Sequence, residues 1–230
     1  MATSNNVKIL GSFASPFVMR ARIAANLKSV GYEFLEEKFG QKSQLLLQSN
    51  PVYKKIPVLI HGDKPVCESL IIVQYIDEAW SSGPSIMPSD PYDRATARFW
   101  ATYVDDKWFP SLSGIARAQG EEAKAALIQQ VRDGIALLEE AFPKCSKGKA
   151  FFGGDEIGYL DIAFGCFLGW LKACEMMNGI KLIDDATTPH LAKWAEKFCS
   201  HCAVKDVMPS TDKLLEFAKV LAAKFKAAQS

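Results

Sequence analysis

Residues 7–80 alternate between short β-type runs and helical patterns, and this alternation constrains the fold more than any other feature of the chain. In the helical stretches, apolar residues recur at three- and four-residue steps, as they do on one face of a helix. Gly62-Asp63 separates two of the β-type runs and is a two-residue turn signal for a hairpin. The expected strands are 7–12, 32–38, 58–61 and 65–67, and the expected helices are 16–30, 43–49 and 69–80.

The order β-α-β-α-β-β-α is that of a thioredoxin-like domain with a mixed four-stranded sheet. After it, residues 83–91 are rich in glycine, proline and serine and lack apolar periodicity, which is typical of a linker. Helical patterns follow, and Pro110 is expected to break or kink the first of them. The sequence thus predicts an α+β fold, with a thioredoxin-like domain at 1–82, a linker at 83–91 and an all-helical domain at 92–230. The helices expected in the second domain are 92–117, 121–142, 160–178, 188–203 and 211–227.

The 230 residues carry a formal net charge of +1 at pH 7, which provides no electrostatic reason to propose a nucleic acid or an anionic membrane as partner. No apolar run approaches the roughly 18 residues that a membrane span requires. Residues 1–6 lack the basic and apolar regions of a secretory signal, so we expect a cytoplasmic protein.

Six cysteines lie in segments that otherwise read as helix or strand end. In a reducing compartment we expect them to be mostly small buried apolar residues rather than disulfides. Cys199 and Cys202 form a C-x-x-C motif with His201 between them, which could serve redox chemistry or a metal. No second cysteine–histidine pair at zinc-finger spacing accompanies the motif. The sequence therefore predicts no metal site and favours a structural interpretation of these residues.

Ser15 precedes Pro16 at the expected start of a helix, and this pair is a preferred helix start with serine as the N-cap. Alternatively, the serine hydroxyl points outward and donates a hydrogen bond to a thiolate, assisted by the helix dipole. Lowering a thiol pKa by about 2 units would raise its ionised fraction at pH 7 from about 3% to about 75%. The more stable thiolate is roughly eightfold less nucleophilic, so the net gain is only about threefold. Holding an electrophile beside the sulfur must then supply much of the remaining acceleration.

Pro57 follows Ile56 at the head of an expected strand, where a missing N–H group costs little. If the bond between them is cis, the Ile56 backbone turns toward the cleft and can pair with a peptide ligand as an added strand does. Lys42 and Lys55 are either solvated surface lysines or the cations that meet a ligand carboxylate on this side.

Glu68-Ser69 opens the helix expected at 69–80. Ser69 is either a simple helix cap, or it binds a carboxylate together with the helix N–H groups while Glu68 meets a ligand ammonium. Arg20 is either a surface arginine or part of a network with Asp105 and Glu68 that bridges the two domains.

Asp161 stands at the third position of an expected helix that begins after Gly158, where its carboxylate can bond back to a loop N–H. This places Asp161 as a folding device without a catalytic role. Aromatic side chains in both domains are either core residues or the walls of an electrophile pocket. The aromatic candidates for that pocket are Phe13, Phe17, Phe39, Trp108 and Trp170.

Three segments carry a resemblance to a known family. Ser15-Pro16-Phe17, the run from Asn50 to Leu59 and the run from Cys67 to Asp77 closely resemble plant tau-class glutathione transferases. The Glu-Ser-Leu-Ile-Ile run is quite specific, whereas Ser-Pro-Phe alone is not. The similarity extends over nearly the whole chain, although many members have serine or threonine where this chain has Gly158.

The resemblance implies a cytoplasmic homodimer that conjugates the thiolate of glutathione to hydrophobic electrophiles, by addition or aromatic substitution, in detoxification and the stress response. Glutathione is then a co-substrate, and no cofactor is bound permanently. The resemblance also implies that Ser15 stabilises the glutathione thiolate and that the Ile56–Pro57 bond is cis. The residues that it implies for glutathione binding are Lys42, Lys55, Ile56, Pro57, Glu68 and Ser69.

Two other functions remain as alternatives. A non-catalytic carrier of hydrophobic metabolites would use the same aromatic pocket. A glutathione-dependent reductase or peroxidase would need a sulfur nucleophile, which Ser15 cannot supply. Cys67 is the nearest substitute along the sequence, but it lies at an expected strand end.

Overall fold

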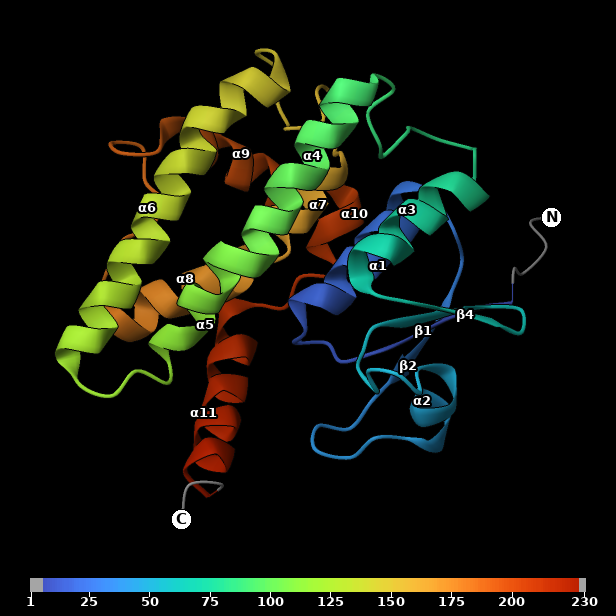
Figure 1. The fold of residues 1–230 in the computed structure, drawn as a ribbon, viewed down its shortest axis with the longest axis horizontal. Helices are drawn as coiled ribbons and strands as arrows, with labels where there is room; N and C mark the ends of the chain where they lie inside the picture. The colour runs from blue at the N-terminus through green and yellow to red at the C-terminus, as the bar shows by residue number, and fades with distance from the viewer. Residues whose placement is uncertain (1–5, 228–230) are drawn as a thin grey trace. The chain divides into compact units, whose positions relative to one another are not determined.

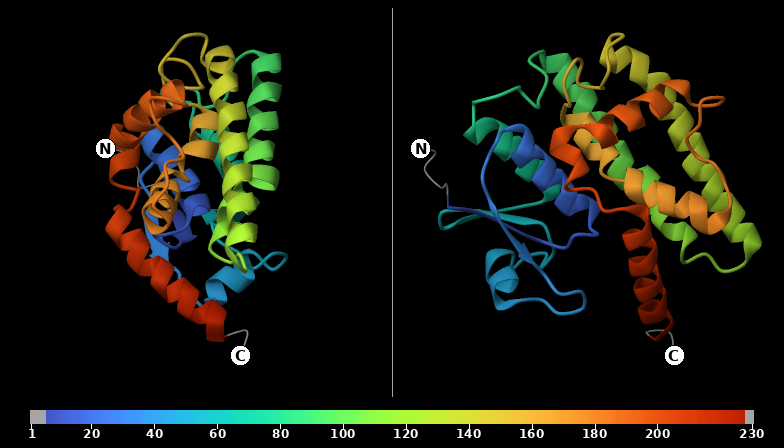
Figure 2. Two further views of the ribbon diagram at one scale, coloured as in Figure 1. Left: turned by 90° about the vertical axis from the view of Figure 1, so that its left-hand side faces the viewer. Right: turned by 180° about the vertical axis from the view of Figure 1, so that it is seen from behind.

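The computed structural model describes residues 6–227, and the chain divides into two compact units. The first unit runs through Met87 and also includes Ser200–Met208. The second unit comprises Pro88–Cys199 and continues from Pro209. Figure 1 and Figure 2 follow the chain from blue at its start to red at its end.

The first unit is built on a sheet that, within residues 6–87, contains four strands in the order β2-β1-β3-β4. β1 is parallel to β2 and antiparallel to β3, and β3 forms a hairpin with β4. This confirms the predicted element order and the mixed sheet. The turn residue Gly62 has a φ of 66°, a left-handed conformation that favours glycine. The strands are β1 (Val7–Gly11), β2 (Glu33–Glu36), β3 (Val58–His61) and β4 (Lys64–Cys67).

Helices cover both faces of the sheet, with α1 and α3 packed together on one side and α2 on the other (Figure 1). Strand alternation explains the two layers, because successive side chains point to opposite faces. Leu10 and Val58 are paired neighbours that pack with Leu46 of α2. Ile9 and Leu59, the adjacent pair, are fully buried on the opposite face. The helices are α1 (Pro16–Leu27), α2 (Gln44–Ser49) and α3 (Ser69–Ala79).

Helix α1 ends at Leu27, before the expected end at residue 30. Ser29 has a φ of 53°, and its N–H bonds to the Asn26 carbonyl. A serine in the left-handed conformation therefore ends the helix, in the role that glycine more often takes. Gly31, the glycine that follows the expected helix, lies outside the capping turn.

The second unit is helical, and its first expected helix has a π-helical turn at its centre. In that turn the Phe109 N–H bonds to the Val104 carbonyl, five residues back. Pro110 then occupies the first turn of the next helix, where a missing N–H is tolerated, and the expected interruption takes the form of the π-helical turn directly before it. The three segments are α4 (Pro91–Tyr103), η1 (Val104–Trp108) and α5 (Phe109–Ile115).

Two expected helices are each divided in the structure, and a third is longer than expected because it continues past Pro143 to Ser146. The helices concerned are α6 (Glu121–Ser146), α7 (Tyr159–Gly165), α8 (Leu168–Asn178), α9 (Pro189–Ser200), α10 (Cys202–Lys205) and α11 (Thr211–Ala227). The short helix α10 belongs to the first unit, where the Asn26 side chain of α1 donates to the Ala203 carbonyl at 3.0 Å. Within residues 6–227, no helix is long and apolar enough to cross a membrane.

Candidate functional site

Ser15 lies at the turn between β1 and α1 and is the N-cap of α1. Its backbone is extended, and its Oγ accepts the Val18 N–H at 3.4 Å, so the capping interpretation is confirmed. That bond uses an oxygen lone pair, and the hydroxyl still carries a proton to donate. The side chain is half-buried at the positive end of the helix dipole. A thiolate beside Ser15 would therefore meet a hydroxyl donor and a favourable field.

The Ile56–Pro57 peptide bond is cis, as the resemblance implied, and it directly precedes β3. Lys55 is exposed just before it. Lys42 is also exposed and directly precedes Ser43, the N-cap of α2. Lys42 thus lies just before α2 and Lys55 lies in the loop after it, and the sequence prediction that they face a ligand carboxylate remains a prediction.

The interpretation of Ser69 as a helix cap is wrong, because Glu68 is the N-cap of α3. Glu68 has a φ of 70°, where a non-glycine residue costs about 1–3 kcal/mol. Ser69 is buried, and its Oγ accepts a hydrogen bond from Arg20 Nη1 at 3.2 Å. Strain of this kind persists where the surrounding structure holds it and is concentrated at functional sites. The start of α3 is therefore a candidate site for the charged end of a ligand.

Arg20 is fully buried, which rules out the surface interpretation. Its guanidinium lies 5.1 Å from the centre of the Phe17 ring and reaches Ser69 from α1. The start of α3 is thus joined to α1, the helix that Ser15 caps. Asp105 lies in the π-helical turn of the second unit, and the network of Arg20, Asp105 and Glu68 stays a prediction.

The five aromatic candidates have different surroundings. In the first unit, Phe13 and Phe17 are half-buried around Ser15, and Phe39 is 46% exposed in the segment before α2. In the second unit, Trp170 of α8 meets the Phe217 ring at 6.4 Å.

Trp108 is a core residue. It is 1% exposed, packs edge-on against Phe164 and donates from its indole N–H to the Val131 carbonyl. Its ring therefore has almost no surface to offer a ligand, which argues against a place in the electrophile pocket.

Asp161 makes the expected bonds to preceding backbone N–H groups. The carboxylate is fully buried and accepts hydrogen bonds from the N–H groups of Phe152, Gly153 and Gly158 and from the Trp194 indole. Burial raises the pKa of Asp161 to about 6, although these four donors act to lower it. The residue ties the loop before α7 to α9, as a folding device would.

All six cysteines lie within the described residues and are free thiols, but the expectation that most of them are buried is wrong, because only Cys166 and Cys174 are buried. His201 Nδ1 accepts the Ala203 N–H at 3.1 Å and thereby caps α10, which accords with the structural interpretation of the C-x-x-C motif. Burial raises the pKa of Cys199 to about 11. Among residues 6–227, no group of three or more metal-ligating side chains is suited to hold an ion.

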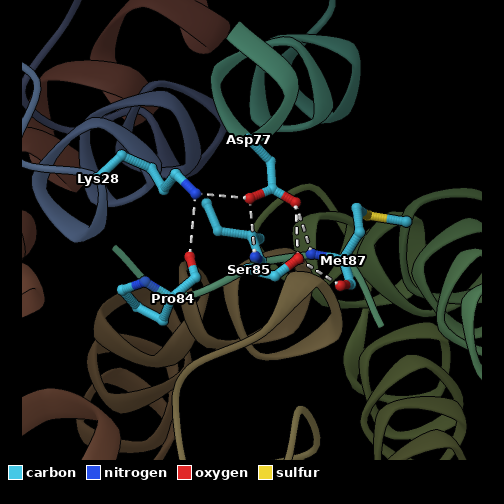
Figure 3. Close-up of polar contacts among 6 residues, drawn as sticks. Lys28, Asp77, Pro84, Ser85 and Met87 are labelled. Atoms are coloured by element: carbon cyan, nitrogen blue, oxygen red, sulfur yellow. Dashed lines mark hydrogen bonds and ion pairs between the residues drawn. The ribbon is translucent and has the colours of Figure 1, made fainter. Parts of the chain in front are cut away.

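The sequence did not predict a buried ion pair between Lys28, the C-cap of α1, and Asp77 of α3, whose charged atoms are 3.1 Å apart (Figure 3). Asp77 also accepts the backbone N–H groups of Ile86 and Met87, and Lys28 also donates to the Pro84 carbonyl. The pair therefore fastens the segment after α3 to the first unit. Lys28 and Asp77 are 49 residues apart, and no local pattern connects them.

Comparisons with known proteins agree with this architecture. The glutathione S-transferase N-terminal domain family matches residues 5–78, and the glutathione S-transferase C-terminal domain family matches residues 121–197. Glutathione S-transferase U17 of Arabidopsis thaliana is 66% identical over 94% of this chain and 96% of its own length. Glutathione S-transferase U18 of the same plant is 63% identical over 96% of this chain and 97% of its own.

Solved structures give the same result. The tau class glutathione S-transferase of mango, Mangifera indica, is 68% identical, with a TM-score of 0.93 over 95% of this chain and all of its own. Rice GST1, solved in complex with glutathione, is 37% identical, with a TM-score of 0.88 over 97% of this chain and 99% of its own. The chain therefore belongs to the glutathione S-transferase family, within its plant tau class.

Proposed function

We propose that this protein is a glutathione S-transferase that joins the sulfur of glutathione to hydrophobic electrophiles. The observation that carries the proposal is the place of Ser15, whose hydroxyl caps α1 and has a proton to donate. In the reaction the glutathione thiol releases its proton to solvent, and the thiolate forms a bond from sulfur to carbon. An aromatic substitution then expels the leaving group with its electron pair, whereas an addition takes up a proton from solvent.

In this proposal the first unit holds glutathione, and the electrophile meets aromatic side chains. Glu68, Ser69 and the free N–H groups at the start of α3 meet the γ-glutamyl end of glutathione. The Ile56 backbone, ahead of the cis bond to Pro57, pairs with the middle of the peptide. Lys42 and Lys55 meet the glycine carboxylate. The residues proposed for the pocket are Phe13, Phe17, Phe39 and Trp170.

Neither alternative function gains support. A reductase would need a reactive thiol, and burial together with the Glu68 charge raises the pKa of Cys67, the nearest candidate. We also propose a cytoplasmic homodimer that acts in detoxification and the stress response, as the resemblance implies. Light scattering of the purified protein tests the dimer.

The catalytic proposal is tested by the ultraviolet absorbance of bound glutathione thiolate against pH. We expect a depressed thiol pKa in the wild type and a higher one in Ser15→Ala, because the mutation removes a bond made to the thiolate. Ser12→Ala is the matched control, since it removes a hydroxyl from the same turn. Equal thiol pKa values in wild type and Ser15→Ala would contradict the assignment.

A further inference from the structure

The segment between α2 and β3 is organised around one buried polar side chain. Residues 51–55 are all exposed, so burial of their own side chains cannot determine their path. Asn50, directly before them, is 2% exposed. Its backbone N–H closes α2 by bonding to the Leu46 carbonyl at 2.9 Å. Asn50 is therefore fixed to the core, whereas the loop that follows it has no buried side chain of its own.

The Asn50 amide makes hydrogen bonds at two points of this loop. Its Oδ1 accepts the Tyr53 N–H at 3.1 Å, and its Nδ2 donates to the Lys55 carbonyl at 2.9 Å. The Asn50 carbonyl accepts the Lys54 N–H at 2.9 Å, and Lys54 takes a left-handed φ of 54°. A buried amide that uses both its donor and its acceptor on one loop specifies that loop strongly, because any other path leaves polar groups unpaired.

The bond to the Lys55 carbonyl has a consequence for the next residue. The carbonyl of Lys55 and the N–H of Ile56 belong to one planar peptide unit and, in a trans peptide, point in opposite directions. By fixing the direction of the Lys55 carbonyl, Asn50 also fixes the direction of the Ile56 N–H. This N–H belongs to the backbone that the proposed function pairs with glutathione.

We propose that Asn50 is a positioning residue for glutathione, which orients the Lys55–Ile56 peptide so that the Ile56 backbone is ready to receive the ligand. The inference rests on the proposed function, since it concerns the same binding site. Asn50 itself touches no ligand in this proposal. It removes the need to order an exposed loop when glutathione binds, and such preorganisation is a source of affinity.

The test is calorimetric titration of glutathione into the wild type and into Asn50→Asp. The aspartate keeps an acceptor for Tyr53 but presents a second oxygen, and no donor, to the Lys55 carbonyl. We expect the Kd for glutathione to rise about tenfold, with kcat at saturating glutathione and the pKa of the bound thiol unchanged. The same rise is expected with γ-glutamylcysteine, which lacks the glycine, because the affected peptide pairs with the middle of the ligand.

Asn26→Asp is the matched control, because Asn26 also donates from its amide to a backbone carbonyl, at 3.0 Å, but in another part of the first unit. A purely structural role for Asn50 would lower the melting temperature of both variants and leave both Kd values at the wild-type level. If Asn50→Asp does not fold, Asn50→Ser keeps a short acceptor for Tyr53 and is expected to show the same rise in Kd.

The role of Asn50 would be overturned, and the proposed function left intact, by either of two results. One is an unchanged Kd for glutathione in a folded Asn50 variant, and the other is a loss of affinity for glutathione that is absent with γ-glutamylcysteine. A wild-type protein that does not bind glutathione would overturn both.

Discussion

The buried ion pair of Lys28 and Asp77 leads to a prediction about stability in which the two partners are unequal. Their side chains are 2% and 8% exposed, so both charges have lost nearly all their contact with water. Removing one partner of such a pair leaves an uncompensated buried charge and typically costs about 3–5 kcal/mol. The cost should depend on what remains around the surviving charge.

The surroundings of the two charges differ. Without Lys28, the Asp77 carboxylate keeps the N–H groups of Ile86 and Met87, both at 2.9 Å. Without the Asp77 charge, the Lys28 ammonium keeps the Pro84 carbonyl, a neutral acceptor, at 3.1 Å. We therefore expect Asp77→Asn to cost about 3–5 kcal/mol and Lys28→Met only about 1–2 kcal/mol, because two backbone donors stabilise the remaining carboxylate.

The measurement is urea unfolding of the two single variants and the double variant, followed by fluorescence and by circular dichroism to check that the transitions coincide. The double variant should be more stable than the sum of the two single losses indicates, since it buries no charge. Lys147→Met, which breaks the exposed pair with Asp93, is the control and should leave the unfolding midpoint unchanged. A larger loss in Lys28→Met than in Asp77→Asn, or additive losses, would refute the reasoning.

Two further predictions concern the second unit. Asp161→Asn should lower the free energy of unfolding by about 2–4 kcal/mol, because the new amide would direct N–H groups at existing donors. The folded pKa of Asp161 is raised to about 6, so its contribution to stability is present below the unfolded value of about 4 and is lost as pH rises through 6. The loss in the free energy of unfolding caused by Asp161→Asn, measured by urea unfolding, should therefore be smaller at pH 8 than at pH 5. A larger loss at pH 8 would show that the four hydrogen-bond donors affect the pKa of Asp161 more than burial does. Gly134→Ala should cost about 1–3 kcal/mol, because its Cβ would lie 2.6 Å from Trp108 Cδ1. Gly31→Ala, where no described atom lies within 4 Å of the new Cβ, is the control, and equal losses at the two glycines in thermal unfolding would count against this explanation.

Much of the first unit could be predicted from local patterns. The strand and helix order and the hairpin turn at Gly62 were correct, because they depend on side-chain periodicity and on turn residues a few positions apart. The cap at Ser15 and the bonds of Asp161 to the loop before α7 belong to the same class. The end of α1 was placed too late for a local reason as well. Ser29 ends the helix in a left-handed conformation, and a serine does not indicate that conformation as a glycine would.

The chemistry around the candidate site needed the folded chain. Glu68, with its left-handed backbone, takes the cap position that the sequence offered to Ser69, while Arg20 reaches Ser69 from 49 residues away. Asn50 can be found from the sequence only as an asparagine before a proline, and nothing there indicates that its amide is buried and bonded to Lys55.

The sequence by itself determined which segments become strands and helices and which residue types stand at their ends, because periodicity and capping act within a few residues. The tertiary structure alone decided which of those residues meet. The pairing of Lys28 with Asp77 and the burial of Trp108 both follow from how helices distant in sequence pack against one another. Such contacts depend on topology and on the exclusion of water from the core, and neither can be determined from a short stretch of the chain.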